Sequence, residues 1–167
     1  PGCALVEGGR PLFGEEARRR CRLSPRLVAS DFWARLDTAP LGPPFPEGLS
    51  AADLVHAHLE SLWKTAKGGT AEVVLALPSV YDEKQLGLLL GIAQSLSMPV
   101  SGLVDAALAA ASAGFPGERL IHVDLGLRRA VVTEIRQGAS LVRERVARID
   151  RFGLGEIHDA WMRGAAE

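Results

Sequence analysis

The alternation of apolar and polar residues predicts short strands and helices along the first third of the chain. Two apolar runs flank Gly8-Gly9, which is typical of a β-hairpin. Residues 37–49 hold four prolines and two glycines, which predicts a loop and a candidate boundary between subdomains. Ser50 and Asp53 have the spacing of a capping box, and apolar residues recur at helical spacing after them. We therefore expect a helix directly after the proline-rich segment, ending at residues 67–69 (Lys-Gly-Gly).

The middle of the chain predicts a buried strand followed by a longer helix. Residues 72–77 form a nearly continuous apolar run, a pattern that suits a strand buried on both faces. Asp82 and Gln85 are placed to cap a helix that runs to about Ser97. Another helix is expected over the alanine-rich residues 105–113.

The last third of the chain predicts a β-meander and a terminal helix. Three apolar segments separated by turns are expected to be its strands, at residues 120–124, 130–136 and 141–149. The segment from Gly155 to Ala166 is expected to be helical. Strands and helices alternate first and a meander follows, so the sequence predicts an α/β layer with a mixed sheet and flanking helices.

Composition restricts the function classes. The chain has 167 residues, a formal net charge of −1 and 47% hydrophobic residues, which favours a globular domain over a binder of nucleic acid or of a membrane surface. No apolar run reaches the roughly 18 to 20 residues of a membrane span. The chain begins at Pro1 without a signal-peptide pattern, so we expect a piece of a cytoplasmic protein. Cys3 and Cys21 fit neither a disulfide framework nor a metal motif.

Other candidate features have ordinary structural interpretations. A basic cluster at residues 18–26 is expected to be a solvated helix face that Glu15 and Glu16 balance, not a nucleic-acid site. His56 and His58 lie two apart on a predicted helix, so they point to different faces and a shared metal is not expected. The tryptophans are expected to pack in the core or against a further lobe, at Trp33, Trp63 and Trp161.

Four motifs occur in order along the chain. They are residues 12–17 followed by Pro25, residues 74–85 (VLALPSVYDEKQ), residues 104–114 and residues 122–126 (HVDLG). This ordered set resembles the nucleotide-binding domain of the seventy-kilodalton heat-shock chaperone (DnaK-like) family, which belongs to the actin-like ATPase superfamily. The first two motifs are similar to that family's entry into a helix and to its strand followed by Val-Pro-Ala-Tyr-Phe-x-x-x-Gln. The last two resemble its Asn-Glu-Pro with an alanine-rich helix and its Asp-Leu-Gly-Gly-Gly-Thr phosphate turn.

A fifth, weaker motif and the overall coverage extend the resemblance to nearly the whole chain. Residues 152–156, FGLGE, are similar to the family's His-Leu-Gly-Gly-Glu before a helix. A bacterial cousin in the same superfamily, such as a cell-division or pilus-assembly ATPase, would fit the ordered set as well. The resemblance implies an actin-like ATPase (ribonuclease H-like) fold. Within it, residues 1–49 would be a partial N-terminal hairpin, basic helix and linker, and residues 50–167 an α/β subdomain with the meander.

The resemblance also implies site residues. Asp105 and Asp124 match the family's catalytic carboxylates, and Asp124 would also hold Mg²⁺ indirectly. The ordinary alternative is that they are end-of-strand and helix-capping acids, because Asp is common at caps. Gly126 matches the first glycine of the phosphate turn. Backbone N–H groups of such glycine turns bind phosphates, because the missing side chain allows close approach.

The sequence departs from the family at two functional positions. Leu127, Arg128 and Arg129 replace Gly-Gly-Thr, which brings side-chain bulk to the phosphate turn. Ala34 stands where the family has its catalytic lysine. Phosphoryl transfer depends on positioning and charge stabilisation, so these losses argue against hydrolysis.

Two classes of function remain open from the sequence. One is a degenerate, non-hydrolysing scaffold or protein-interaction module that contacts a protein partner or client. The alternative is a nucleotide-dependent chaperone-like or actin-like ATPase whose remaining motifs lie outside this chain. ATP or ADP with Mg²⁺ is the cofactor that the resemblance implies, and none is expected for the isolated chain.

Overall fold

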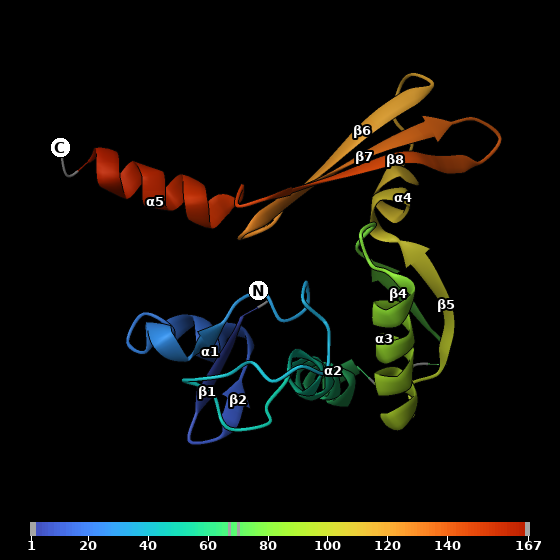
Figure 1. Cartoon of the computed structure of the whole chain (residues 1–167). Helices are drawn as coiled ribbons and strands as arrows, with labels where there is room; N and C mark the ends of the chain where they lie inside the picture. Colours follow the sequence, from blue (N-terminus) through green and yellow to red (C-terminus); the bar gives the residue numbers. More distant parts are fainter. Residues whose placement is uncertain (1–2, 67, 70, 166–167) are drawn as a thin grey trace. The chain divides into compact units, whose positions relative to one another are not determined.

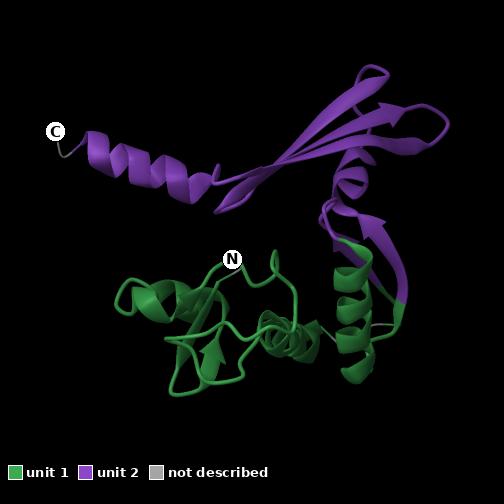
Figure 2. Ribbon diagram, in the orientation of Figure 1, with its two compact units in different colours: residues 1–73, 82–100 green, residues 74–81, 101–167 purple. Residues whose placement is uncertain are grey.

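A computed structural model, which describes residues 3–66, 68–69 and 71–165, has a mixed α/β structure. The described residues form three small sheets and five α-helices (Figure 1). The chain divides into two compact units (Figure 2). Unit 1 comprises Pro1–Val73 and Asp82–Val100, and unit 2 comprises Val74–Tyr81 and Ser101–Glu167. The subdomain boundary expected at residue 49 stays a prediction.

Unit 1 begins with the expected hairpin. Its strands are β1 (Ala4–Glu7) and β2 (Arg10–Leu12), and positive φ angles of 57° and 78° at Gly8 and Gly9 form the turn. A two-residue strand that the sequence did not predict, β3 (Val28–Ala29), pairs antiparallel with the other edge of β1. A segment of two residues is too short to show the periodicity of a strand in the sequence. Pairing with β1 stabilises this strand.

The helical segments in the described part of unit 1 are α1 (Gly14–Arg20), the short 3-10 helix η1 (Pro25–Leu27), α2 (Ala51–Ala66) and α3 (Glu83–Ser95). Of these, α2 and α3 begin where the sequence places their caps. Before α2, Ser50 N donates to Asp53 Oδ2 at 2.8 Å and Asp53 N donates to Ser50 Oγ at 3.2 Å. Before α3, Asp82 and Gln85 form the same reciprocal pair. Both predicted caps are confirmed; Lys67, expected at the end of α2, lies outside the described residues.

An aromatic cluster packs beside the core of unit 1. Phe13 stacks on His58 with ring centroids 4.6 Å apart, and Phe32 lies 6.0 Å from the same imidazole. Trp33 Nε1 donates a hydrogen bond to His58 Nδ1 at 2.9 Å. Burial lowers the pKa of His58 below its ordinary value, because a charged imidazole is poorly solvated there. His58 therefore serves as a neutral hydrogen-bond acceptor between rings.

Unit 2 contains the expected meander and two helices. Its strands and helices are β4 (Val73–Leu77), β5 (Val100–Asp105), α4 (Ala106–Ala111), β6 (Arg119–Leu125), β7 (Arg129–Gln137), β8 (Leu141–Asp150) and α5 (Leu154–Gly164). Strands β4 and β5 pair in a two-stranded sheet. Strands β6, β7 and β8 form an antiparallel sheet in that order, with an irregularity in β7 between Glu134 and Ile135. The three strands predicted for the meander are confirmed.

Helix α4 covers one face of the meander. Ala107 and Ala111 of α4 form a buried cluster with Ile135 of β7, and Leu120 packs against it (Figure 1). Side chains alternate between the faces of a strand, so Ile121 and Val123 point to the other face, where they are 57% and 58% exposed. One face of this sheet is therefore an exposed apolar surface.

One sequence expectation about burial is wrong. Strand β4 is not buried on both faces, because Val74 is 60% exposed while Leu77 is 8% exposed. The strand belongs to a sheet of two strands, and among the described residues nothing covers the side on which Val74 lies. Trp161 does not pack in a core of the described residues: it is 75% exposed, on a helix with no buried residue. The alternative expectation, that it packs against a further lobe, stays a prediction.

Among the described residues, every helix is too short or too polar to form a membrane span.

Candidate functional site

Asp105, one of the two predicted catalytic carboxylates, caps helix α4. Its Oδ1 atom accepts hydrogen bonds from the Ala107 backbone N at 2.9 Å and from Ser79 Oγ at 2.8 Å. Its Oδ2 atom accepts from Arg143 Nη1 at 2.7 Å. Both carboxylate oxygens are thus engaged by groups of unit 2, which ties the start of α4 to strand β8.

The residues around Asp105 extend this polar cluster into the sheet. Thr133, fully buried on β7, donates from Oγ1 to Ser79 Oγ at 3.2 Å. Arg143 Nη1 also donates to the Ser79 backbone oxygen at 3.2 Å. Burial alone would raise the pKa of Asp105, but hydrogen bonds from Ser79 and Arg143 outweigh it and lower the pKa. The cluster holds Asp105 as a carboxylate with a structural set of partners.

Asp124, the second predicted carboxylate, lies in a different environment. It is exposed on β6, opposite Val131 of β7. Its side chain forms no hydrogen bond or ion pair with the described part of the chain, and no hydrogen bond joins it to Asp105. Across the same residues, no group of three or more His, Cys, Asp or Glu side chains could hold a metal ion.

The turn expected to bind phosphate, Gly126 to Arg129, is closed by backbone hydrogen bonds. Gly126 N donates to Arg129 O at 2.9 Å, which closes the turn on itself. The carbonyl oxygens of Gly126 and Leu127 accept from the N–H groups of Leu154 and Gly155, at 2.9 and 2.8 Å. The first N–H groups of a helix are those that most readily bind an anion. In this chain, two such groups of α5 are already paired with the turn.

Two glycines allow helix α5 to approach the turn this closely. A Cβ atom at Gly153 would lie 2.5 Å from Leu127 O and 2.7 Å from Gly126 O, distances that side chains do not tolerate. A Cβ atom at Gly155 would lie 2.9 Å from the same Leu127 oxygen. Residues 152–156 were expected only to form a weak motif before a helix. Their glycines are the signal that the backbone of another segment lies close by.

The arginines of the turn are engaged by acidic side chains. Arg128 Nη1 lies 3.4 Å from Glu156 Oε1, and Arg129 Nε lies 3.9 Å from Asp150 Oδ1. Burial raises the pKa of Tyr81 to about 12, and the charge of Arg129 opposes that shift. Each arginine thus has a carboxylate neighbour within unit 2, which competes with any phosphate for the same guanidinium.

In unit 1, Ala34 and the basic cluster of residues 18–26 have structural roles. Ala34 stands where the resemblance places a catalytic lysine. The backbone oxygen of Ala34 accepts from Gln85 Nε2 at 3.5 Å, and its methyl side chain carries no charge. Within α1, Glu15 pairs with Arg18 at 2.6 Å and with Arg19 at 3.1 Å. The expectation that acidic residues balance the basic cluster is confirmed for Arg18 and Arg19.

Sequence reasoning missed three members of the polar cluster and a hollow in the proline-rich loop. Ser79, Thr133 and Arg143 come from separate segments, and no spacing rule connects residues 54 or 64 positions apart. The hollow lies within residues 40–48 of unit 1. It forms because the loop closes on itself, and the sequence shows only that this segment is a loop.

Comparison with known proteins adds no family to these observations. No protein-family model matches the chain, and no curated protein matches it. The geometry of the site itself therefore has to support any functional hypothesis.

Proposed function

We propose that this chain is a divergent relative of the seventy-kilodalton heat-shock chaperone nucleotide-binding domain that does not hydrolyse ATP and acts as a scaffold for protein contacts. In this proposal the actin-like fold is retained while the nucleotide site has decayed. The proposal rests on the sequence motifs for its family and on the closed Gly126–Arg129 turn for its function.

The closed turn is the observation that carries the proposal. A phosphate bound at this turn would need N–H donors, but Gly126 N donates to Arg129 O, and the turn presents carbonyl oxygens to helix α5. Carbonyl oxygens repel a phosphate, and removing Leu154 N and Gly155 N from them would leave polar groups without partners. Both carboxylate oxygens of Asp105 likewise already accept hydrogen bonds, from Ser79, Ala107 and Arg143. These features favour the scaffold over the ATPase.

Exposed apolar surface supports the second half of the proposal. Within unit 2, Ile121, Val123 and Ile149 on one face of the meander are 57%, 58% and 44% exposed. On α5, Trp161 and Met162 are 75% and 60% exposed. Contiguous exposed apolar surface is a usual mark of contact with another polypeptide.

Calorimetric titration of Mg-ATP and of Mg-ADP into the chain tests the proposal. We expect no saturable heat up to about 1 mM nucleotide, which corresponds to binding weaker than about −4 kcal/mol, while a thermal melt shows that the protein is folded. Micromolar binding that Asp124→Asn abolishes and Asp159→Asn leaves unchanged would contradict it. That result would favour the nucleotide-dependent ATPase instead, with Mg²⁺ and nucleotide bound near Asp124.

A further inference from the structure

The proline-rich loop of unit 1 is a closed and internally bonded structure. Pro40 and Ser50 form an isolated β-bridge at its base, and Leu41 N donates to Leu49 O at 2.8 Å. Within the loop, Phe45 N donates to Gly42 O at 3.0 Å. Proline rings further restrict the backbone. The loop therefore holds its shape before any partner arrives, which reduces the entropy lost on binding.

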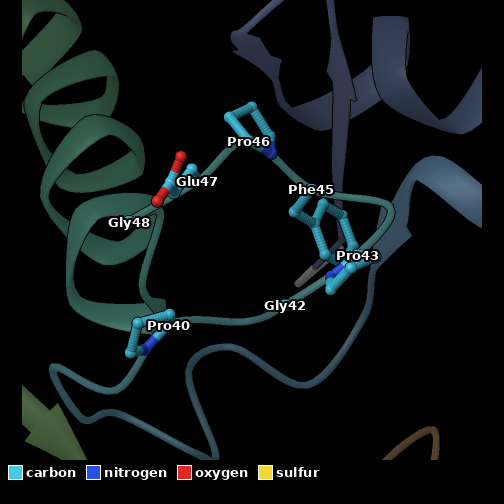
Figure 3. A pocket seen from close by; sticks show the side chains of 7 residues that line it. All are labelled: Pro40, Gly42, Pro43, Phe45, Pro46, Glu47 and Gly48. Carbon is cyan, nitrogen blue, oxygen red and sulfur yellow. The ribbon is translucent and has the colours of Figure 1, made fainter.

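The loop surrounds a small hollow, which Figure 3 shows from close by. Its volume is about 250 Å³. The residues that line it are mostly apolar: Pro40, Gly42, Pro43, Phe45, Pro46, Glu47 and Gly48. Pockets for drug-sized ligands occupy roughly 300–1,000 Å³. The hollow is therefore suited to one side chain, not to a nucleotide.

One acidic side chain breaks the apolar character of this hollow. Glu47 is the charged residue among those that line it, and it is exposed. It forms no ion pair or hydrogen bond with the described residues of the chain. Phe45, two residues earlier, contributes an aromatic ring to the same hollow (Figure 3). An occupant should thus combine an apolar stem with a cationic, planar head.

Arginine has this combination of properties. Its guanidinium group stacks on aromatic faces and pairs with carboxylates, while its methylene stem packs on apolar surface. Lysine carries a more strongly hydrated point charge and stacks less well. We propose that the Pro40–Gly48 loop binds an arginine side chain of a partner polypeptide, with Glu47 pairing with the guanidinium and Phe45 stacking against it.

This inference rests on the proposed scaffold function, because it names the chemistry of a partner. The two can nevertheless fail separately. If the loop does not bind arginine, the proposed arginine site is wrong, and the nucleotide titration still tests the proposed scaffold function. Nucleotide binding near Asp124 would overturn the scaffold and leave the loop measurement unaffected.

The test is an NMR titration of the ¹⁵N-labelled chain with the peptide acetyl-Gly-Arg-Gly-amide. The matched probe carries citrulline, an uncharged isostere, in place of arginine. We expect saturable shifts of the amides of Leu41, Gly42, Phe45, Glu47 and Gly48 with the arginine peptide. The citrulline peptide should bind at least about fivefold more weakly, because the charge-assisted pair is lost.

Two loop variants and one control complete the experiment. Glu47→Gln and Phe45→Leu should each weaken the binding of the arginine peptide about fivefold or more, because each removes one of the two proposed contacts with the guanidinium. Glu72→Gln, which changes an exposed acidic residue outside the loop, should leave the affinity for this peptide unchanged. Unchanged amide spectra away from the loop would show that the variants are folded. Absence of saturable loop shifts, equal binding of both peptides, or full affinity in Glu47→Gln would each overturn the proposal.

Discussion

Gly153 lies against Leu127 so closely that a Cβ atom on Gly153 would come within 2.5 Å of the Leu127 carbonyl oxygen. This contact brings the first turn of α5 onto the turn that joins β6 to β7, where Leu154 N and Gly155 N pair with its carbonyls. The contact is backbone against backbone, so side-chain rearrangement cannot relieve it. The closed state of the turn therefore depends on a residue without a side chain.

We predict that Gly153→Ala destabilises the chain by about 1–3 kcal/mol, the usual cost of overpacking. The added methyl group must displace the backbone of Leu127 or of α5. Gly138→Ala is the matched control, because nothing lies within 4 Å of a Cβ at Gly138 in the same unit. Urea denaturation should show a lower midpoint for Gly153→Ala alone. Equal midpoints for both variants would contradict the close approach described for Gly153.

The polar cluster around Asp105 gives a second prediction. Asp105→Ala removes the cap of α4 and leaves Ser79 and Arg143 without their acceptor. Loss of an N-cap alone costs about 0.5–2 kcal/mol, so we expect a loss of at least that size. Asp124→Asn should change stability by less than about 0.5 kcal/mol, because its side chain is exposed and without a partner among the described residues. Comparable losses in the two variants would contradict the structural role of Asp105.

The acid sensitivity of the chain should also depend on Asp105. Its pKa is lower in the folded chain than the ordinary value of 3.8. The unfolded chain therefore binds the proton more readily, and the stabilisation by Asp105, complete above pH 3.8, is lost as the pH falls from there through the folded pKa. Asp105→Asn should lose less stability than the wild type over that interval. Parallel stability curves for the two proteins, measured by denaturant unfolding, would rule this out.

Local sequence rules predicted local structure well. Ser50 with Asp53 and Asp82 with Gln85 were predicted as helix caps, and each pair is formed by neighbouring residues. The hairpin at Gly8-Gly9 is local in the same sense. Capping and turn formation depend on a few consecutive residues, so their physical causes are present in the sequence.

Burial and the site were harder to predict, because they depend on distant segments. The apolar run around Val74 predicted that this side chain is buried, but a face of a strand is buried only if another layer packs on it. Asp105 was expected to be a catalytic or a helix-capping carboxylate, but its partners Ser79 and Arg143 are 26 and 38 residues away and could not be predicted. The closed turn was equally hidden, since strands β7 and β8 separate Leu127 from Gly153 in the sequence. The catalytic role suggested for Asp105 and Asp124 stays a prediction.

His58 gives a prediction for milder acid. Burial lowers its pKa below 6.5, so the folded chain resists protonation and stability should fall as the pH drops below 6.5. Protonation at Nδ1 would also abolish the hydrogen bond that Trp33 Nε1 donates to this atom. His58→Phe keeps a ring against Phe13 but removes the titrating group, so its stability should change less between pH 7.5 and pH 5.5. The same pH dependence in wild type and variant would show that His58 is not responsible.

The exposed side chain of Trp161 on helix α5 should contribute little to the stability of the chain, in contrast to the first turn of that helix. Trp161 is 75% exposed and no residue of α5 is buried, whereas Phe32 is fully buried in unit 1. Removing a buried aromatic ring costs about 3–5 kcal/mol, while a change at an exposed position usually stays within about 0.5 kcal/mol. Phe32→Ala should therefore lower the urea midpoint strongly and Trp161→Ser hardly at all. A loss above about 1 kcal/mol in Trp161→Ser would mean that α5 packs against part of the chain, and its apolar face would then no longer support the proposed contact with a partner.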